Sequence, residues 1–227
     1  MIRIDNIVRE YKTGETVVPA LRSVSLEIKN GEFLSIAGPS GSGKTTLLNL
    51  IGCIDAPDGG EIWIDDQAVS KMDTRQKTDF RRNNLGFIFQ TYNLIPVLTA
   101  YENVSFVLSI LSVEDSEIKK RTMRILEEVG LKGMEHRRPD KLSGGQQQRI
   151  AIARALIKQP KIILADEPTA NLDSATGEDI LRLMKQMNER YGTTFIFSTH
   201  DKMVMDWADR LVMLHDGSIV SDERRRQ

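Results

Sequence analysis

The chain has 227 residues, 40% of them hydrophobic, and its 31 basic and 32 acidic side chains give a net charge of −1. A chain of this length buries roughly 70% of its unfolded surface, so it can fold as one domain without disulfides or structural metals. The balanced charge argues against a nucleic-acid-binding surface, because such surfaces normally carry a basic excess. We therefore expect no nucleic-acid partner.

Membrane insertion and disulfide bonding are both disfavoured. No segment approaches the roughly 20 apolar residues that a membrane-spanning helix needs, and the N-terminal residues alternate like a strand instead of forming a signal-peptide core. Any membrane role is therefore expected to come through a partner. Cys53 is the only cysteine, which excludes a disulfide within the chain and fits a reducing cytosol. Its apolar neighbours indicate a small buried side chain.

Strands dominate the first quarter of the chain. Alternating or continuous apolar residues predict strands at residues 1–8, 24–28, 32–37 and 61–65. A helix is predicted at residues 45–52, directly after the third of these strands.

The turn between that strand and that helix fits the phosphate-loop pattern G-x-x-x-x-G-K-[ST]. The predicted ATP-binding residues here are Gly38, Pro39, Ser40, Gly41, Ser42, Gly43, Lys44, Thr45 and Thr46. The glycines let backbone N–H groups converge on phosphate oxygens at a helix N-terminus, which carries partial positive charge. Lys44 is expected to reach the β- and γ-phosphates, and the Thr45 hydroxyl to bind Mg²⁺. The alternative is a glycine-rich turn with a solvated lysine, which the flanking strand and helix disfavour.

The middle of the chain is predicted to be helical. After a strand at residues 85–89, Thr99 and Glu102 have capping-box spacing, which predicts a helix through residue 111. Residues 114–129 predict a second, more charged helix. We therefore expect a helical subdomain at about 91–142, inserted into a core formed by about 1–90 and 143–227.

The last third of the chain alternates between helices and strands. The predicted elements are helices at 144–158 and 174–190 and strands at 161–165 and 193–198. This alternation predicts a parallel sheet covered on both faces. A hairpin around residues 216–217 is expected to close the domain, and the arginines at 224–226 are expected to form a solvated tail.

Polar side chains follow the strands of this last third. Asp166 and Glu167 come directly after an apolar run, at the carboxyl end of a strand, where open α/β sheets bind ligands. His200 follows another buried run in the same way. An acidic loop and a structural histidine are the alternatives, and the phosphate loop favours the functional interpretation of both.

A second glycine motif lies about a hundred residues after the phosphate loop, and its residues are Leu142, Ser143, Gly144, Gly145 and Gln146. Ser143 and Gln146 have capping-box spacing, so Ser143 is expected to cap the following helix. Gly144 and Gly145 would let a phosphate approach that helix N-terminus closely. Because the chain already has one phosphate cradle, the second is best used by a nucleotide bound to another copy. The spacing permits this arrangement without requiring it.

Together, these motifs resemble the ATPase subunit of ABC transporters, and the resemblance covers nearly the full chain. It implies an α/β P-loop NTPase fold with an antiparallel β subdomain and an inserted α-helical subdomain. It also implies ATP hydrolysis with Mg²⁺ by a head-to-tail dimer that sandwiches two ATP molecules between facing motifs.

The resemblance assigns roles to residues near the predicted strand ends. Asp166 would hold Mg²⁺, and Glu167 would orient or deprotonate the attacking water. Gln90 matches the glutamine that binds Mg²⁺ or this water, and His200 matches the histidine that contacts the γ-phosphate. The implied metal ligands are thus Thr45, Gln90 and Asp166.

Two further assignments rest on the same resemblance. Tyr11 lies where the family places an aromatic side chain that stacks on adenine, an interaction worth about 1–3 kcal/mol; the alternative is a surface tyrosine. Asn171, Leu172 and Asp173 match the segment that contacts the opposite protomer.

Residues 50–55 and 89–96 resemble one branch in particular, the ATPases of lipoprotein-releasing systems and of macrolide and peptide efflux pumps. This implies a membrane-spanning partner with a large extracytoplasmic domain that is moved mechanically, and a location at the cytoplasmic face of the inner membrane. Residues 91–104 are expected to line the docking surface, with Tyr92, Leu94, Ile95 and Leu98 as its apolar side chains. The alternative is that these side chains serve ordinary packing between the subdomains.

Two alternatives to a transporter subunit remain. A regulatory ATPase of a cell-division or cell-wall-remodelling complex would share the fold and the membrane partner but transport nothing. An ATPase acting on ribosomes or DNA is disfavoured, because those groups carry two such domains or long coiled coils, and this chain has neither.

Overall fold

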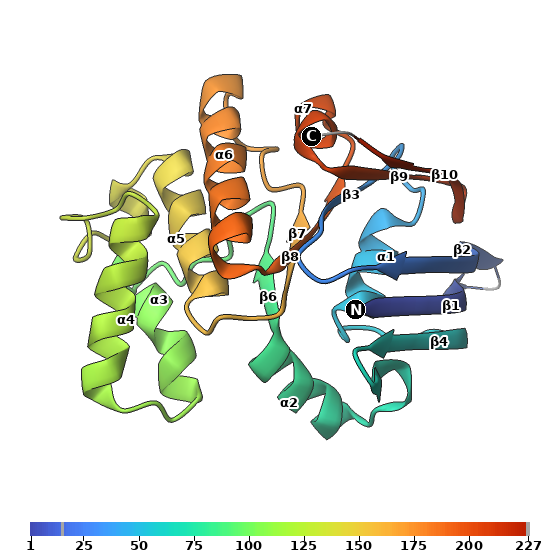
Figure 1. Cartoon of the computed structure of the whole chain (residues 1–227), viewed down its shortest axis with the longest axis horizontal. Coiled ribbons are helices and arrows are strands. Elements are labelled where there is room, and N and C mark those ends of the chain that lie inside the picture. Colours follow the sequence, from blue (N-terminus) through green and yellow to red (C-terminus); the bar gives the residue numbers. More distant parts are fainter. Residues whose placement is uncertain (15, 226–227) are drawn as a thin grey trace.

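Two β-sheets organise the chain, as Figure 1 shows. The computed structural model describes residues 1–14 and 16–225. The smaller sheet is antiparallel, with the order β2-β1-β4-β5. Its strands are β1 (Ile2–Thr13), β2 (Thr16–Ile28), β4 (Gly59–Ile64) and β5 (Gln67–Ala68).

The larger sheet has the order β10-β9-β3-β8-β7-β6 and is parallel except for β10. Its strands are β3 (Phe33–Ala37), β6 (Leu85–Ile88), β7 (Ile162–Asp166), β8 (Thr194–Thr199), β9 (Arg210–His215) and β10 (Ser218–Arg224). The parallel strands place their carboxyl ends at one edge, which is where the polar side chains predicted to act lie.

Helices lie on both faces of the larger sheet and beside it. They are α1 (Lys44–Ile51), α2 (Thr74–Asn84), α3 (Ala100–Ile110), α4 (Asp115–Glu128), α5 (Gly144–Leu156), α6 (Ser174–Tyr191) and α7 (Lys202–Trp207). Two short 3₁₀ turns lie at Val69–Lys71 and Pro139–Lys141. None of the helices in residues 1–14 and 16–225 combines the length and the apolar content that crossing a bilayer requires.

Alternation along the central strands creates two cores. In β8, Phe195 and Phe197 pack into a cluster formed with residues of α3 to α7, whereas Ile196 points the other way. That opposite cluster contains the apolar side of α1 and the inner face of the antiparallel sheet. The central sheet is therefore covered on both faces, as its near-continuous apolar strands predict.

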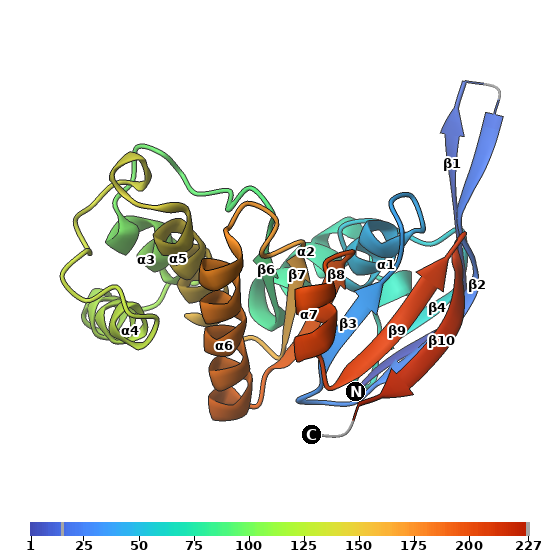
Figure 2. The same cartoon turned by 90° about the horizontal axis from the view of Figure 1, so that it is seen from above.

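Two features lie away from this sandwich. Helices α3 and α4 pack on each other and on α5, at the left in Figure 1. In Figure 2, β1 and β2 extend as a two-stranded ribbon beyond the rest of the molecule. Both strands are longer than predicted, because their outer halves pair with each other in place of packing an apolar face on the core.

The α/β class and the antiparallel sheet are confirmed, whereas two helices were not predicted. In α2 only Phe80 is buried, so the helix lacks an apolar stripe. Its signal is a capping box in which Asp73 and Gln76 bind each other's backbone N–H groups. The other missed element, α7, is only six residues long and has one buried side chain, Val204.

The prediction of a solvated arginine tail is wrong for the part of it that the structure describes. Arg224 ends β10, and the Arg225 guanidinium donates to the carbonyl of Met205 at 2.7 Å. The Arg225 backbone also donates to the carbonyl of Asp209 at 2.8 Å. These bonds hold the chain end against the loop at the end of α7. Arg226 lies outside the described residues.

Candidate nucleotide-hydrolysis site

The phosphate loop connects β3 to α1 and leaves the first N–H groups of this helix uncapped. Gly43 occupies the N-cap position with φ of 100°, and no side chain caps the helix. The Lys44 ammonium donates to the carbonyls of Gly38 and Pro39, both at 2.8 Å. Free N–H groups, a helix N-terminus and a lysine converge here, an arrangement that binds phosphate.

Only glycine fits at two positions of this loop. A Cβ on Gly43 would lie 2.4 Å from the carbonyl oxygen of Ala20, and one on Gly38 would lie 2.1 Å from that of Leu214. Both contacts are with backbone atoms, which cannot turn aside as a side chain can. The loop is thus pressed between β2 and the end of β9, and this packing fixes its shape.

The carboxyl ends of β7 and β8 bring the predicted acidic residues together. Asp166 ends β7, and its carboxylate oxygens lie 3.3 and 3.5 Å from the Thr45 hydroxyl. Glu167 accepts hydrogen bonds from the Thr199 hydroxyl at 3.0 Å and from the backbone N–H of His200 at 3.1 Å. The His200 Nδ1 lies 2.6 Å from the same carboxylate.

These contacts give Glu167 and His200 different environments. Glu167 has a φ of 46°, an uncommon conformation for a residue with a side chain, and only 15% of its side chain is exposed. Its carboxylate is held by the start of the loop after β8. The His200 ring is 69% exposed and faces outward. A fixed carboxylate beside an accessible imidazole can orient a water molecule and contact a phosphate.

One open cavity of about 600 Å³ joins the phosphate loop to these side chains. It is lined by Tyr11, Val18, Pro19, Ala20, Pro39, Ser40, Gly41, Gly43, Lys44, Thr45, Thr46, Gln90, Glu167 and His200. Three of these residues, 18–20 on β2, were missed, because nothing in the sequence indicates that the ribbon forms a wall of the cavity. The predicted phosphate-loop residues Gly38 and Ser42 and the predicted metal ligand Asp166 are not among the lining residues.

The loop after β6 carries Gln90 into the cavity and is held from behind. The Asn171 amide donates to the carbonyl of Gln90 at 2.8 Å. The Arg154 guanidinium donates to the carbonyls of Tyr92 and Asn93, at 2.7 and 2.5 Å. Both Tyr92 and Asn93 have positive φ, so these bonds maintain a strained turn. The loop therefore links the cavity to α5 and to the segment before α6.

The second glycine motif does not line this cavity. Ser143 caps α5 in the predicted capping box with Gln146. Gly144 and Gly145 have a packing role, since a Cβ on Gly145 would lie 2.5 Å from Thr176 Cγ2. A Cβ on Gly144 would lie 3.0 Å from the Tyr92 hydroxyl. The start of α5 therefore lies beside the predicted partner-contacting residues 171–173 and apart from the chain's own phosphate loop.

Residues 171–173 form the turn that starts α6. Leu172 packs against the helical core, and the Asp173 side chain accepts from the backbone N–H of Thr176 at 3.0 Å. Hydrogen bonds from the backbone and side chain of Thr176 lower the pKa of the Asp173 carboxyl. Asp173 is therefore occupied as a helix cap within its own chain.

The donor groups fit a magnesium ion. The Thr45 hydroxyl and the Asp166 carboxylate are adjacent, and Gln90 lines the same cavity. Oxygen ligands of this kind suit Mg²⁺, which keeps several waters and binds substrate phosphates. In the part of the chain that the structure describes, no group of three or more His, Cys, Asp or Glu side chains could hold a metal.

Comparison with known protein families matches residues 21–170 to the family described as ABC transporter. The chain belongs to this family. Its relatives include the ABC transporter ATP-binding protein MJ0796 of Methanocaldococcus jannaschii, which is 47% identical over 100% of this chain and 98% of that protein. The chain is accordingly an ABC-type ATP-binding subunit, an ATPase whose family drives membrane transport.

The chain is also similar to solved structures and to relatives that are longer than itself. A dimeric structure of MJ0796 in a post-hydrolysis state, bound to ADP and phosphate, has a TM-score of 0.91 and 46% identity, with 100% of both chains covered. The macrolide export ATP-binding/permease protein MacB of Brucella abortus is 44% identical over 100% of this chain. The chain spans only 35% of that protein.

Proposed function

We propose that this ATPase works as a head-to-tail dimer that drives a membrane-spanning partner in lipoprotein release or efflux. The proposal of a dimer rests on one observation: the two glycine motifs of a single chain do not line the same cavity. The cavity gathers the phosphate loop with Gln90, Glu167 and His200, whereas the Ser143 motif lies outside it. A second copy can supply this motif to the open side of the cavity, and the dimeric structures of MJ0796 support that arrangement.

In this proposal the residues of one chain bind and orient ATP. The N–H groups at the start of α1 and the Lys44 ammonium bind the β- and γ-phosphates, and Tyr11 stacks on the base. Glu167 orients the attacking water and accepts its proton, while the Thr199 hydroxyl and the His200 N–H hold the carboxylate. His200 contacts the γ-phosphate, which leaves as inorganic phosphate while ADP remains.

The negative charge of the ATP phosphates would be stabilised by a magnesium ion and by the partner copy. Thr45, Asp166 and Gln90 would hold Mg²⁺, which neutralises negative charge on the β- and γ-phosphate oxygens. From the partner copy, the uncapped N–H groups of Gly144 and Gly145 would face the γ-phosphate. Loss of that phosphate would then remove the bridge between the two copies and open the dimer.

Replacing Glu167 tests this mechanism. Glu167→Gln keeps the side-chain shape but cannot accept a proton, so hydrolysis is expected to fall about 10²–10⁴-fold while ATP binding persists. The variant should accumulate as an ATP-bound dimer in size-exclusion chromatography with light scattering. Glu178→Gln, at an exposed position of α6, is the matched control. Normal turnover by Glu167→Gln would overturn the role of Glu167.

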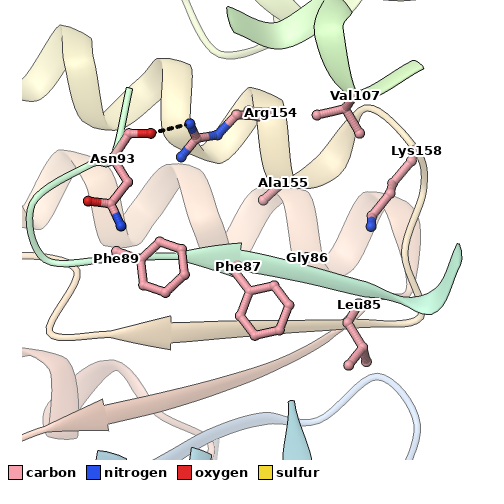
Figure 3. A pocket seen from close by; sticks show the side chains of 9 residues that line it. All are labelled: Leu85, Gly86, Phe87, Phe89, Asn93, Val107, Arg154, Ala155 and Lys158. Atoms are coloured by element: carbon pink, nitrogen blue, oxygen red, sulfur yellow. Dashed lines mark hydrogen bonds between the residues drawn. The ribbon is translucent and has the colours of Figure 1, made fainter. Parts of the chain in front are cut away.

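We propose that the inserted helices, at about residues 91–142, form a subdomain. The membrane partner would dock between this subdomain and the core. A groove of about 270 Å³ runs beside β6, the edge strand of the larger sheet (Figure 3). It is lined by Leu85, Gly86, Phe87, Phe89, Asn93, Val107, Arg154, Ala155 and Lys158.

Exposed apolar side chains lie on α3, which contributes Val107 to the groove, and on the segment that precedes this helix. Val97 is 69% exposed, and Phe106 and Ile110 on α3 are about half exposed. Tyr92 and Leu98, from the predicted docking segment, are half-buried. An apolar groove together with exposed apolar residues on the segments that form it is typical of a protein interaction site. Because Arg154 binds the loop that carries Gln90, a partner seated here would bear directly on the cavity.

A charged substitution tests the docking surface. Val97→Asp, Tyr92→Asp and Leu98→Asp are expected to abolish stimulation of ATP hydrolysis by the partner and to leave the basal rate intact. Met123→Asp, at a similarly exposed position of α4, is the control. Retained stimulation in all three variants, with folding verified by circular dichroism, would contradict the assignment.

The partner itself can be captured with the hydrolysis-deficient variant. We propose that the chain binds at the cytoplasmic face of the inner membrane. Tagged Glu167→Gln is purified from membranes in the presence of ATP. It should co-purify with a protein that has few membrane spans and a large extracytoplasmic domain. The MacB relatives, whose name joins an ATP-binding part to a permease, support a membrane partner. Recovery of ribosomes or nucleic acid would defeat the transporter proposal and leave the ATPase activity in place.

A further inference from the structure

Tyr11 contacts a cluster of polar side chains that do not themselves line the cavity. The Asp55 carboxylate accepts from the Tyr11 hydroxyl at 3.0 Å. It also accepts from Arg9 Nε and Nη2, at 3.1 and 3.0 Å, in a two-pronged ion pair. The Arg9 guanidinium carbon lies 4.8 Å from the centre of the Tyr11 ring, within the range of a cation–π contact.

A second carboxylate fixes the other side of Arg9. Asp58 accepts from Arg9 Nη1 at 2.9 Å and from the backbone N–H of Glu10 at 2.7 Å. The Arg9 and Asp55 side chains are only 20% and 26% exposed, whereas Tyr11 is 38% exposed. The exposed residue is therefore held by two partners that are themselves largely covered.

The loop that contributes Asp55 belongs to the phosphate-binding helix. It follows α1, and the backbone N–H of Ile54 donates to the carbonyl of Asn49 at 2.9 Å within that helix's last turn. The N-terminus of α1 carries Lys44 and Thr45. One rigid element thus fixes both the site for the phosphates and the ring that would receive the base.

The arrangement leaves one face of the ring for a ligand. Tyr11 lines the cavity, whereas Arg9 and Asp55 do not. Because Arg9 covers one face of the ring, the other is available to a planar group in the cavity. An exposed tyrosine without partners would lose rotamer freedom when a base stacks on it, and fixing it beforehand removes that cost.

We propose that Asp55 is a positioning residue of the nucleotide site, which orients Tyr11 directly and through Arg9 so that a purine base stacks on its free face. This inference rests on the proposed role of Tyr11 as the base platform. Stacking tolerates different bases. ATP and GTP should therefore depend on Asp55 equally, and a ligand that lacks a base should not depend on it.

The test compares a nucleotide with its phosphate chain alone. Dissociation constants of the full chain are measured by calorimetry for Mg²⁺ with adenylyl imidodiphosphate, which resists hydrolysis, and for Mg²⁺ with inorganic tripolyphosphate. Tyr11→Ala is expected to weaken nucleotide binding about tenfold, and Asp55→Ala about fivefold. Neither should change tripolyphosphate binding. Asp179→Ala, which breaks an exposed ion pair on α6, is the matched control.

Two further variants test whether Asp55 acts by orienting the Tyr11 ring or only by supporting the local structure. Tyr11→Phe keeps the ring but loses the bond to Asp55, so it should weaken nucleotide binding about two- to threefold. In the double variant Tyr11→Ala with Asp55→Ala, the loss should equal that of Tyr11→Ala alone, because Asp55 acts through the ring. If Asp55→Ala fails to fold, Tyr11→Phe carries the test, and unchanged nucleotide affinity in it would overturn the proposal.

The remaining outcomes discriminate between this inference and the proposed function. Equal weakening of nucleotide and tripolyphosphate by Asp55→Ala would mean that the loop only supports α1, and the inference fails. Losses that add in the double variant would also defeat it. If Tyr11→Ala weakens nucleotide binding and Asp55→Ala does not, only the role of Asp55 is lost. If Tyr11→Ala has no effect, the base platform itself is wrong.

Discussion

Helices α1 and α5 both begin at a glycine-rich motif, yet the two starts are built differently. The start of α1 has no side-chain cap, and Gly43 stands at its N-cap in a left-handed conformation. The start of α5 is closed by a complete capping box between Ser143 and Gln146. The first start lies in the wall of a cavity, and the second does not.

This difference shows how two similar sequences acquire different tasks. An uncapped helix start inside an open cavity leaves its N–H groups to water or to a ligand. A capped start is stable without a ligand, so it can remain exposed until it contacts a phosphate bound to another copy of the chain. Four predictions test or sharpen this distinction, beginning with the largest expected effect.

The first prediction is that Lys44 and Ser143 serve the same nucleotide from different chains. Lys44→Ala removes charge-assisted bonds and should weaken ATP binding by a single chain about 10- to 100-fold. Ser143→Arg should leave this binding unchanged but reduce hydrolysis by about 10²–10³-fold, because the second start can no longer meet the phosphate. ATP binding and phosphate release are measured for each variant.

Mixing these two variants provides the decisive control. In the proposed arrangement each mixed dimer holds one intact composite site, so an equimolar mixture should hydrolyse ATP faster than either variant alone. No recovery of activity over a range of mixing ratios would contradict the two-chain arrangement.

The second prediction concerns how glycine substitutions at the starts of α1 and α5 change the free energy of unfolding of the chain. Gly43→Ala combines a left-handed conformation with a backbone clash and should lower this free energy by about 3 kcal/mol. Gly41→Ala, at φ of 79° with nothing within 4 Å, should cost only about 1 kcal/mol. Gly145→Ala should cost less than Gly43→Ala, since its contact is a methyl group. Urea denaturation measures all three, and equal losses would show that packing does not distinguish the starts.

The third prediction separates the capping role of Ser143 from its proposed ligand role. Ser143→Ala should lower the free energy of unfolding by about 1 kcal/mol and also impair hydrolysis. Helix α3 carries the same capping box, formed by Thr99 and Glu102, without a glycine motif. Thr99→Ala should therefore have the same effect on unfolding but leave hydrolysis by the isolated chain unchanged. Similar hydrolysis in both variants would assign Ser143 a capping role only.

The smallest effect concerns Lys158, just beyond the end of α5. Its ammonium donates to the carbonyls of Arg81 and Arg82 at the end of α2, and burial lowers its pKa to about 8. Between pH 8 and its ordinary value of 10.5, the unfolded chain binds more protons than the folded one. The free energy of unfolding should therefore rise with pH in this window relative to Lys158→Met. A constant difference in urea denaturation across the window would contradict the lowered pKa.

Much of the fold could be predicted because the central strands are nearly all apolar. The run at 193–198 was expected as a buried strand and is found as β8, one residue further along. The capping boxes at Thr99 and Ser143 were found where their spacing placed them. Helix α2 could not be found from apolar periodicity, because polar side chains surround its one buried residue, Phe80.

The site was predictable where a local motif carries the chemistry. The residues of the phosphate loop follow a fixed spacing, and Asp166 and Glu167 come directly after an apolar strand. Nothing in the sequence indicated that residues 18–20 line the same cavity, or that Asp55 bonds to Arg9 and Tyr11. These contacts join residues that are more than 40 positions apart in the chain, or that lie on a ribbon with no apolar face.

The sequence by itself determined the buried strands, the helices with an apolar stripe or a recognised cap, and the local turns that can cradle a phosphate, because these depend on short-range periodicity and on backbone freedom at glycine. Only the tertiary structure decided which of these turns share a cavity. The parallel order of β3, β8 and β7 brings Lys44, His200 and Glu167 to one edge. The same folding leaves Ser143 outside, because α5 packs on the opposite face of the sheet from α1.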